Sequence, residues 1–365
     1  MGLRRRRRDA STSRGSNAPE PPTRTALRNL SSSWFLISQG TGILAIVLWQ
    51  LHYQFRGLRT IAIIVWAAAI VFYLAVLGLY IVRALCFPKY FLSQLRNNNS
   101  EVACLASISV ALFSIIQMLN LVLGPKGSGW AMTAYVLWWI NTVLAIFAIL
   151  IIPYSFAILN PPGIENLLPN SQLPIVAALT CAAAGASIGS SEMLTTAQKI
   201  PVVVVSYLLV GTSVPLTLFL DGLFLGRLFN QTKEHGAEPK AGAQALAVAY
   251  QELILTGPWS QGSTALQSLG QVVLSGLFAR FERGTFLTAQ ASPTVGYCSI
   301  FAGLLFWGHA TFWWVFAILS IMYNLFLAKQ GKKKTAFAFA TWSTVFPFVS
   351  HMLVNDRIYL VEYAY

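Results

Sequence analysis

Long apolar segments recur along almost the whole chain, and they constrain its fold more than any other feature. A helix that crosses a bilayer needs about 20 mostly apolar residues. Only 10% of the 365 residues are charged and 56% are hydrophobic, whereas soluble domains carry about 25% charged residues. We therefore predict an all-α polytopic membrane protein with nine spans, near residues 34–53, 61–85, 102–123, 130–154, 173–190, 201–228, 255–278, 296–325 and 336–354.

Positive charge is concentrated in clusters beside these spans. The net charge is +13, with eight Arg in the first 28 residues and four Lys between positions 329 and 334. Such clusters mark the cytoplasmic side and can contact anionic lipid, so we do not expect nucleic acid as a partner. With the N-terminus in the cytoplasm, nine spans leave 18 Lys and Arg inside and seven outside. We expect residues 1–30 to be a disordered basic cytoplasmic tail and residues 31–365 to form the transmembrane domain.

Polar residues alternate between successive spans. The five odd-numbered spans hold 27 Ser, Thr, Asn, Gln and His residues, while the four even-numbered spans hold 12 in a similar total length. Polar groups in hydrocarbon are costly unless they have a partner or are hydrated. The alternation therefore predicts that the odd-numbered spans line an aqueous path and that the even-numbered spans face lipid.

The seventh span carries the clearest candidates for lining that path. Five of its polar side chains follow a 3-4-3-4 spacing, which places them on one face of a helix; they are Gln261, Thr264, Ser268, Gln271 and Ser275. Hydrogen bonding between helices is an alternative role for such a face.

The ninth span combines small polar residues with one bulky ring. Ser343, Phe346 and Ser350 share a helical face, and Pro347 removes a backbone donor and bends the helix. A ring at a bend in a wet path could close it by steric block and dewetting. A packed core phenylalanine beside a common membrane proline remains an equal alternative on these residues alone.

Several stretches, in order, resemble the tellurite-resistance/dicarboxylate transporter family, which includes fungal sulfite efflux pumps, malic acid permeases and plant slow anion channels. The resemblance is carried by WFLISQGTGILAIVLW, YQFRGLRTIAIIVW, YVLWWIN, LTGPWSQGSTALQSLGQ, LLFWGHATFWWVFAI and WSTVFPFV. It implies five helical hairpins with the odd-numbered helices around a central pore, and a homotrimer. It also implies that Phe346 and Pro347 form the pore gate, and that Gly40, Thr41 and Gly42 of the first span line the pore.

Two departures from the family pattern stand out. The paired Trp before the ninth-span motif reads Thr341-Trp342 here, and nine spans are predicted where the family has ten. A truncated remnant that does not transport therefore stays open as an alternative.

The resemblance implies a plasma-membrane transporter of small anions, with sulfite efflux as the leading function. A C4-dicarboxylate or malate carrier and an exporter of a carboxylated pathway product are alternatives. An anion leaving a negative cell interior gains about 2.3 kcal/mol per charge per 100 mV, so export needs no proton coupling. Coupled uptake would need a buried proton carrier, for which the candidates are Asp221, His309, His52 and Glu252.

A membrane enzyme is the competing class of function. The sequence contains no HExxH or DDxxD pattern and no cluster with metal-ligand spacing. We therefore expect no enzymatic activity, no metal and no cofactor. Asp221 is expected to pair with Arg227, which lies six residues further along the sixth span.

Overall fold

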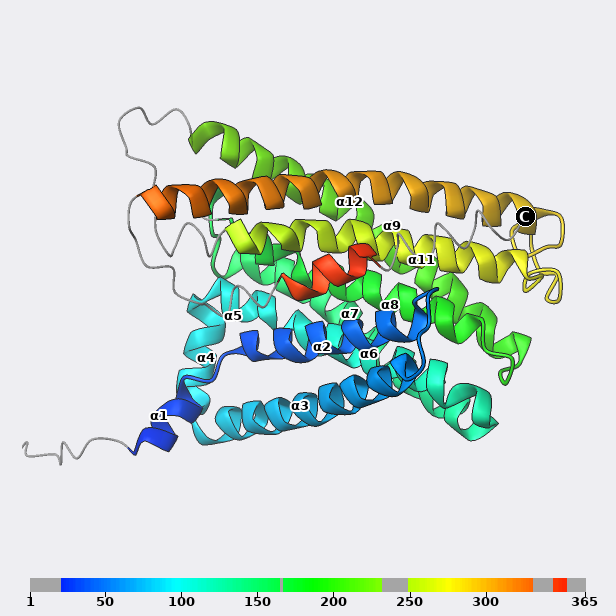
Figure 1. Cartoon of the computed structure of the whole chain (residues 1–365), viewed down its shortest axis with the longest axis horizontal. Helices are drawn as coiled ribbons and strands as arrows, with labels where there is room; N and C mark the ends of the chain where they lie inside the picture. The colour runs from blue at the N-terminus through cyan, green and yellow to red at the C-terminus, as the bar shows by residue number, and fades with distance from the viewer. Residues whose placement is uncertain (1–20, 165–166, 232–248, 331–343, 353–365) are drawn as a thin grey trace, which may run out of the picture.

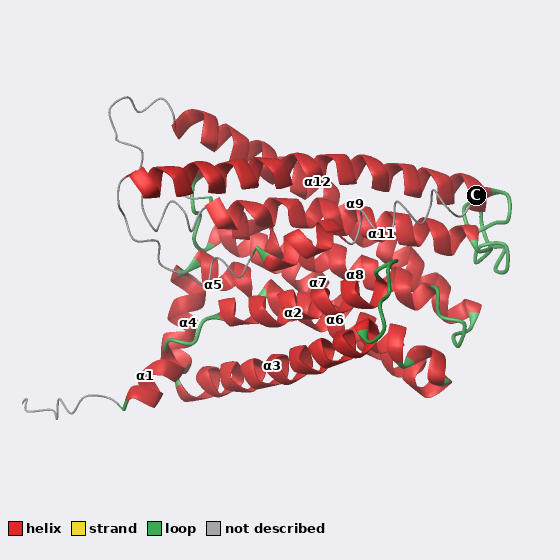
Figure 2. Cartoon of the chain, viewed as in Figure 1, coloured by secondary structure: helices red, strands yellow, loops and turns green. Residues whose placement is uncertain are grey.

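Helices joined by loops make up the part of the protein that the structure describes, which is residues 21–164, 167–231, 249–330 and 344–352 of a computed structural model (Figure 2). The first elements are α1 (Pro22–Arg28), η1 (Ser32–Trp34), α2 (Phe35–Gln50), α3 (Leu58–Cys86), α4 (Pro88–Asn97), α5 (Asn99–Cys104) and α6 (Ala106–Val122). They are followed by η2 (Gly124–Lys126), α7 (Ser128–Ile158), η4 (Pro169–Gln172), α8 (Leu173–Gly189) and α9 (Thr196–Gln231). The last are η5 (Leu253–Leu255), α11 (Thr256–Leu274), α12 (Ala291–Gln330) and a helix at 345–352.

Four helices form an inner row in the order α2, α6, α8 and α11, each packed against the next. Each of them also packs against the long helix that follows it in the chain, which is α3, α7, α9 or α12 respectively (Figure 1). The chain is thus a series of antiparallel hairpins, with the first helix of every hairpin inside. The hairpins predicted from the family resemblance are present for these four pairs.

Burial separates the two sets of helices. Between 56 and 94% of the residues in the apolar windows of α2, α5–α6 and α8 are buried, against 17 to 39% for α3, α7, α9 and α12. The outer helices expose large apolar side chains such as Val71, Phe147 and Phe219. An apolar surface of this extent is typical of contact with lipid, and the polar alternation in the sequence follows from it.

Seven helices of the described part are long and apolar enough to cross a membrane, and they correspond to the predicted spans one to six and eight. The predicted seventh span is α11, which is more polar but is packed between α8, α9 and α12. The predicted ninth span is described only at residues 344–352. The count of nine spans therefore stays a prediction.

Small residues explain how α8 contacts five other α-helices. Ala, Gly, Ser and Thr fill most of this helix, and all but one of its 17 residues are buried. A Cβ atom on Gly185 would lie 2.0 Å from the Ser206 hydroxyl of α9. Glycine at this position therefore permits the close approach of the two helix backbones.

The structure differs from the expected disordered tail at Pro22–Arg28, which forms the short helix α1. Pro22 suits the first turn, where a helix leaves backbone N–H groups without intrahelical partners. Residues 1–20 lie outside the described residues. In Figure 1, α1 and α4 lie at the left, where α2 and α11 begin; we call this the starting end of the bundle, and the opposite end the far end.

Candidate functional site

A polar cavity of about 310 Å³ opens at the far end, between the last turns of all four inner helices. Six of the ten residues around it are Ser or Gln, and the others are Ala, Val or Leu. The cavity is lined by Gln50, Leu121, Ala183, Ala186, Ser187, Ser190, Ser268, Gln271, Val272 and Ser275. We call it the vestibule. Because α2, α6, α8 and α11 each contribute to its wall, it lies where the four helices face one another.

Three of the five residues predicted on the polar face of α11 line the vestibule, namely Ser268, Gln271 and Ser275. The other two, Gln261 and Thr264, lie earlier in α11 and are buried. The same helical face thus runs from the vestibule into the interior of the bundle. That all five residues line one conducting path stays a prediction.

Sequence reasoning missed the contributions of Gln50, Ser187 and Ser190 to the vestibule. These residues end α2 and α8, and α8 has too few polar residues to show a periodic pattern. A search for polar residues at the corresponding ends of the odd-numbered spans would have found all three.

The predicted Gly40-Thr41-Gly42 triplet is placed in the wall between α2 and α6. A Cβ atom on Gly42 would lie 1.9 Å from the Ser114 hydroxyl of α6, so glycine permits this crossing. Gly40 is buried, and the Thr41 hydroxyl donates to the Ile37 carbonyl at 2.8 Å. These contacts give the triplet a packing role, and its part in lining a pore stays a prediction.

Phe346 lies inside the bundle. Its side chain is 2% exposed and belongs to the same buried apolar cluster as residues of α2, α6, α8 and α11. The helix at 345–352, drawn in red in Figure 1, occupies the middle of the bundle's length. Pro347 and Ser350 are also buried, and the Ser350 hydroxyl donates to the Pro347 carbonyl at 3.0 Å. Ser343 lies outside the described residues.

The other side of this short helix packs on α12. The His351 ring stacks on Trp307 and Trp314, with ring centroids 5.9 and 5.5 Å away. Phe348 contacts Trp314 at 5.8 Å and is 38% exposed. Phe346 and Phe348 therefore have different surroundings, although they are two residues apart.

Asp221 of α9 is a buried carboxylate held by several donors. Its Oδ2 atom accepts hydrogen bonds from the indole N–H groups of Trp259 at 2.6 Å and Trp313 at 2.9 Å. The Gln172 amide donates to Oδ1 at 2.5 Å, and His309 Nε2 lies 3.4 Å from Oδ2. The carboxylate thus joins α9 to α11, α12 and the turn η4 before α8.

The expected pairing of Asp221 with Arg227 is wrong. The Arg227 guanidinium donates instead to the carbonyl oxygen of Leu167. The indole donors come from α11 and α12, so no spacing along the sixth span could have indicated them.

Glu252 is a second buried carboxyl, at the starting end just before η5 and α11. Burial raises its pKa to about 7, while the Ser320 hydroxyl and the positive charge of Arg227 act in the opposite direction. The group is therefore partly protonated at neutral pH.

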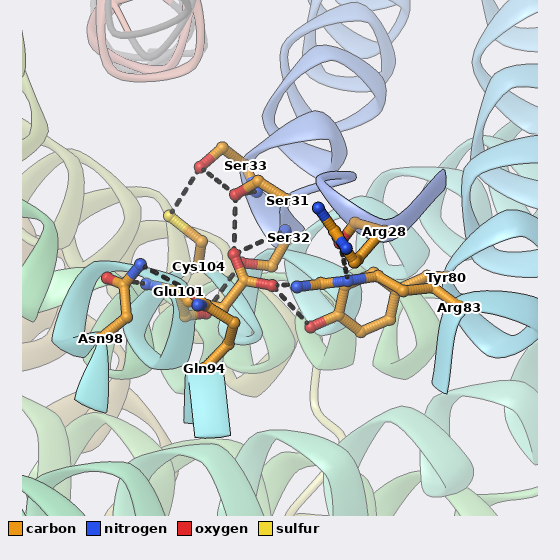
Figure 3. Close-up of polar contacts among 10 residues, drawn as sticks. All are labelled: Arg28, Ser31, Ser32, Ser33, Tyr80, Arg83, Gln94, Asn98, Glu101 and Cys104. Atoms are coloured by element: carbon orange, nitrogen blue, oxygen red, sulfur yellow. Dashed lines mark hydrogen bonds and ion pairs between the residues drawn. The ribbon is translucent and has the colours of Figure 1, made fainter. Parts of the chain in front are cut away.

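A buried ion pair joins the beginnings of α2 and α5 to the end of α3 (Figure 3). Arg83 Nη1 lies 2.6 Å from Glu101 Oε1, and the Tyr80 hydroxyl donates to the same oxygen at 3.0 Å. Glu101 Oε2 accepts from the Ser31 hydroxyl at 2.7 Å and from the backbone N–H of Ser32 at 3.1 Å. The two carboxylate oxygens are thus satisfied from two other segments of the chain, the end of α3 and the residues before α2.

The chain folds into hairpins whose first helices lie inside the bundle, around a polar vestibule and a buried aromatic ring. This arrangement defines a membrane protein of the channel or transporter class. The chain belongs to the voltage-dependent anion channel family (SLAC1), whose sequence profile matches residues 29–361. The family resemblance predicted from the motifs is thereby confirmed, and the protein is an anion channel or transporter.

Similar proteins of known name fall into two groups. The sulfite efflux pump SSU1 of Arthroderma benhamiae is 28% identical over 323 residues, which cover 88% of this chain and 80% of that protein. The sulfite efflux pump of Trichophyton rubrum matches over the same lengths. The malic acid transport protein of Schizosaccharomyces pombe is 22% identical over 336 residues, covering 90% of this chain and 70% of that protein.

Proposed function

We propose that the protein exports small anions across the plasma membrane, with sulfite as its substrate. The observation that carries the proposal is the polar vestibule on the axis of the inner helices, with Phe346 buried among the same helices. In this arrangement an anion crosses between α2, α6, α8 and α11, and the Phe346 ring closes the path until it moves aside.

The sulfite assignment is supported by the two sulfite efflux pumps described above, which match at 28% identity, against 26 and 22% for the malic acid transport proteins. Outward movement is favoured by the membrane potential, by about 2.3 kcal/mol per charge per 100 mV. This energy is available without a proton carrier, and the buried carboxylate Asp221 is fully engaged with indole and amide donors.

The orientation follows from charge. The starting end carries the basic helices α1 and α4, and basic residues beside spans mark the cytoplasmic side. We propose that residues 1–30 are a cytoplasmic tail, that residues 31–365 form the membrane domain, and that the vestibule opens outside the cell. Lipid contacts the apolar faces of α3, α7, α9 and α12, apart from any surface used in a homotrimer.

A malate or other C4-dicarboxylate substrate is the second candidate, and the malic acid transport relatives favour it. Sulfite flux from proteoliposomes under an imposed potential, at alkaline pH where sulfite stays ionised, separates the two. We expect potential-driven sulfite movement that excess malate does not reduce. Malate-sensitive, proton-dependent flux would assign the dicarboxylate instead, and protein-free liposomes report the leak.

A further inference from the structure

Gln261 is buried in the second turn of α11 without a hydrogen-bond partner among the described residues. Its side chain is 0% exposed, and neither its amide nitrogen nor its amide oxygen is bonded to any described residue. Most buried polar side-chain atoms in proteins have a partner, because an unsatisfied buried amide is costly. Packing alone therefore does not explain why the Gln261 amide is buried in this position.

The helical repeat shows which way Gln261 faces. Ser268 and Gln271 lie seven and ten residues after it, which returns to the same face of α11 at 3.6 residues per turn. Both of these residues line the vestibule. Gln261 therefore faces the axis of the inner helices. At 1.5 Å per residue it lies roughly 10 Å from Ser268, toward the starting end.

Several hydroxyl groups along this axis are poor donors for an anion. The Thr180, Thr264 and Ser268 hydroxyls each donate to a backbone carbonyl of their own helix, that of Ala177, Ser260 and Thr264 respectively. A hydroxyl engaged in this way presents only lone pairs to the path, and these repel a negative charge. The Gln261 amide has two N–H donors that no carbonyl of the described residues accepts.

Two more glutamines lie on vestibule-lining faces of other helices. Gln117 is one turn before Leu121 in α6, and Gln39 is three turns before Gln50 in α2. Both side chains are buried, and the amide oxygen of each has no partner among the described residues. A half-turn of a terminal amide exchanges its oxygen and its NH₂ group, so each can also present donors.

We infer that Gln261 is the main ligand of a binding site for a partly dehydrated oxyanion, with Gln39 and Gln117 on the walls of the same axis. The inference rests on the proposed anion transport and names the residues that recognise the anion. Uncharged amide donors replace part of the hydration shell without a fixed positive charge. Such a site holds the ion weakly enough to release it, as conduction requires.

The test compares Gln261→Leu with Gln267→Leu, both made in the Phe346→Ala background. Gln267 is a buried glutamine of the same helix, but it contacts Gly303 of α12 and bonds to Ser263 at 2.9 Å. We expect Gln261→Leu to raise the KM for sulfite flux by about tenfold or more, because a hydrogen bond to a charged group is lost. Gln267→Leu should leave the KM within about twofold of that of the Phe346→Ala background. Gln261→Asn keeps an amide, so its KM should lie between those of Gln261→Leu and the background.

Binding measured separately from flux distinguishes the inference from the proposed function. We expect sulfite to raise the melting temperature of the purified wild-type protein and of Gln267→Leu, but not of Gln261→Leu. If Gln261→Leu and Gln267→Leu behave alike in both KM and sulfite-dependent melting, the site is overturned and the transport function stands. If sulfite protects only the proteins that retain Gln261 while no variant shows flux, the site stands and transport fails. If neither flux nor protection occurs in any protein, both are overturned.

Discussion

Arg83 and Glu101 form an ion pair with 2.6 Å between Nη1 and Oε1, and both side chains are less than 5% exposed. The pair joins α3 to α5 at the starting end of the bundle (Figure 3). Removing one partner of a buried pair leaves an uncompensated charge, whereas replacing both with apolar residues is often neutral.

Glu101→Leu alone should therefore lower the free energy of unfolding by about 3 kcal/mol or more. The double variant Arg83→Met/Glu101→Leu should recover a large part of this loss. Thermal unfolding in detergent, followed by tryptophan fluorescence, measures both. Equal melting temperatures for the wild-type protein and Glu101→Leu would show that the pair is not buried in solution.

The contact between Gly42 and Ser114 predicts that a larger residue at position 42 can be compensated by a smaller residue at position 114. Gly42→Ala should destabilise the protein by roughly 1–3 kcal/mol, because the added methyl group overlaps the Ser114 side chain. Ser114→Gly in the same chain should restore the melting temperature in part, since the new Cβ would meet no other atom closely. Gly78→Ala in α3 is the matched control, because a Cβ there meets nothing within 4 Å. A loss at Gly78 as large as that at Gly42 would contradict the packing explanation.

The hydrogen bonds around Asp221 predict that replacing this residue lowers the stability of the protein more than it changes the selectivity between sulfite and malate. Asp221→Asn should destabilise the protein by about 2 kcal/mol, because the neutral amide is a weaker acceptor and its NH₂ group meets the indole N–H donors. His309→Gln should cost less, since His309 is 3.4 Å from the carboxylate and partly exposed. The melting temperature and the sulfite-to-malate flux ratio are the measurements. A changed ratio with an unchanged melting temperature would instead place Asp221 in the transport path.

Glu252 predicts how stability varies with pH. Its pKa in the folded protein is raised from 4.5 to about 7 by burial, so the folded state binds more protons than the unfolded state between these values. This contribution to stability is complete below pH 4.5 and is lost as the pH rises through 7. Its size is of the order of 3 kcal/mol, at 1.36 kcal/mol per pKa unit.

Glu252→Gln should therefore flatten the fall in melting temperature between pH 5 and pH 8, which are rough bounds set by the same titration. It should be more stable than the wild-type protein at the alkaline end. An unchanged slope in the variant would show that another group is responsible for the pH dependence.

The sequence predicted the layering of helices because one physical rule controls it. Polar side chains are tolerated in a membrane only away from lipid, so counting them in each span separated inner from outer helices correctly. The face of α11 was predicted for a similar reason, since a helical repeat needs only one element. Three residues of that face line the vestibule.

Features that depend on two or more helices could not be predicted in this way. The donors around Asp221 come from α11, α12 and η4, and the partners of Glu101 come from α3 and the start of α2. No periodicity within a single span carries such information. The role of Phe346 was assigned from the family resemblance rather than from its own neighbours, and its burial among the inner helices was visible only in the structure.

The most direct test of the account is potential-driven sulfite flux through Phe346→Ala, compared with Phe348→Ala in the same liposome system. Phe348 lies on the same short helix but is partly exposed and contacts Trp314 of α12. We predict that Phe346→Ala increases sulfite flux by roughly tenfold or more, which corresponds to lowering the barrier by about 1.4 kcal/mol, and that Phe348→Ala changes it little. Equal flux through the wild-type protein and Phe346→Ala, with both proteins folded, would contradict the claim that this ring closes the path.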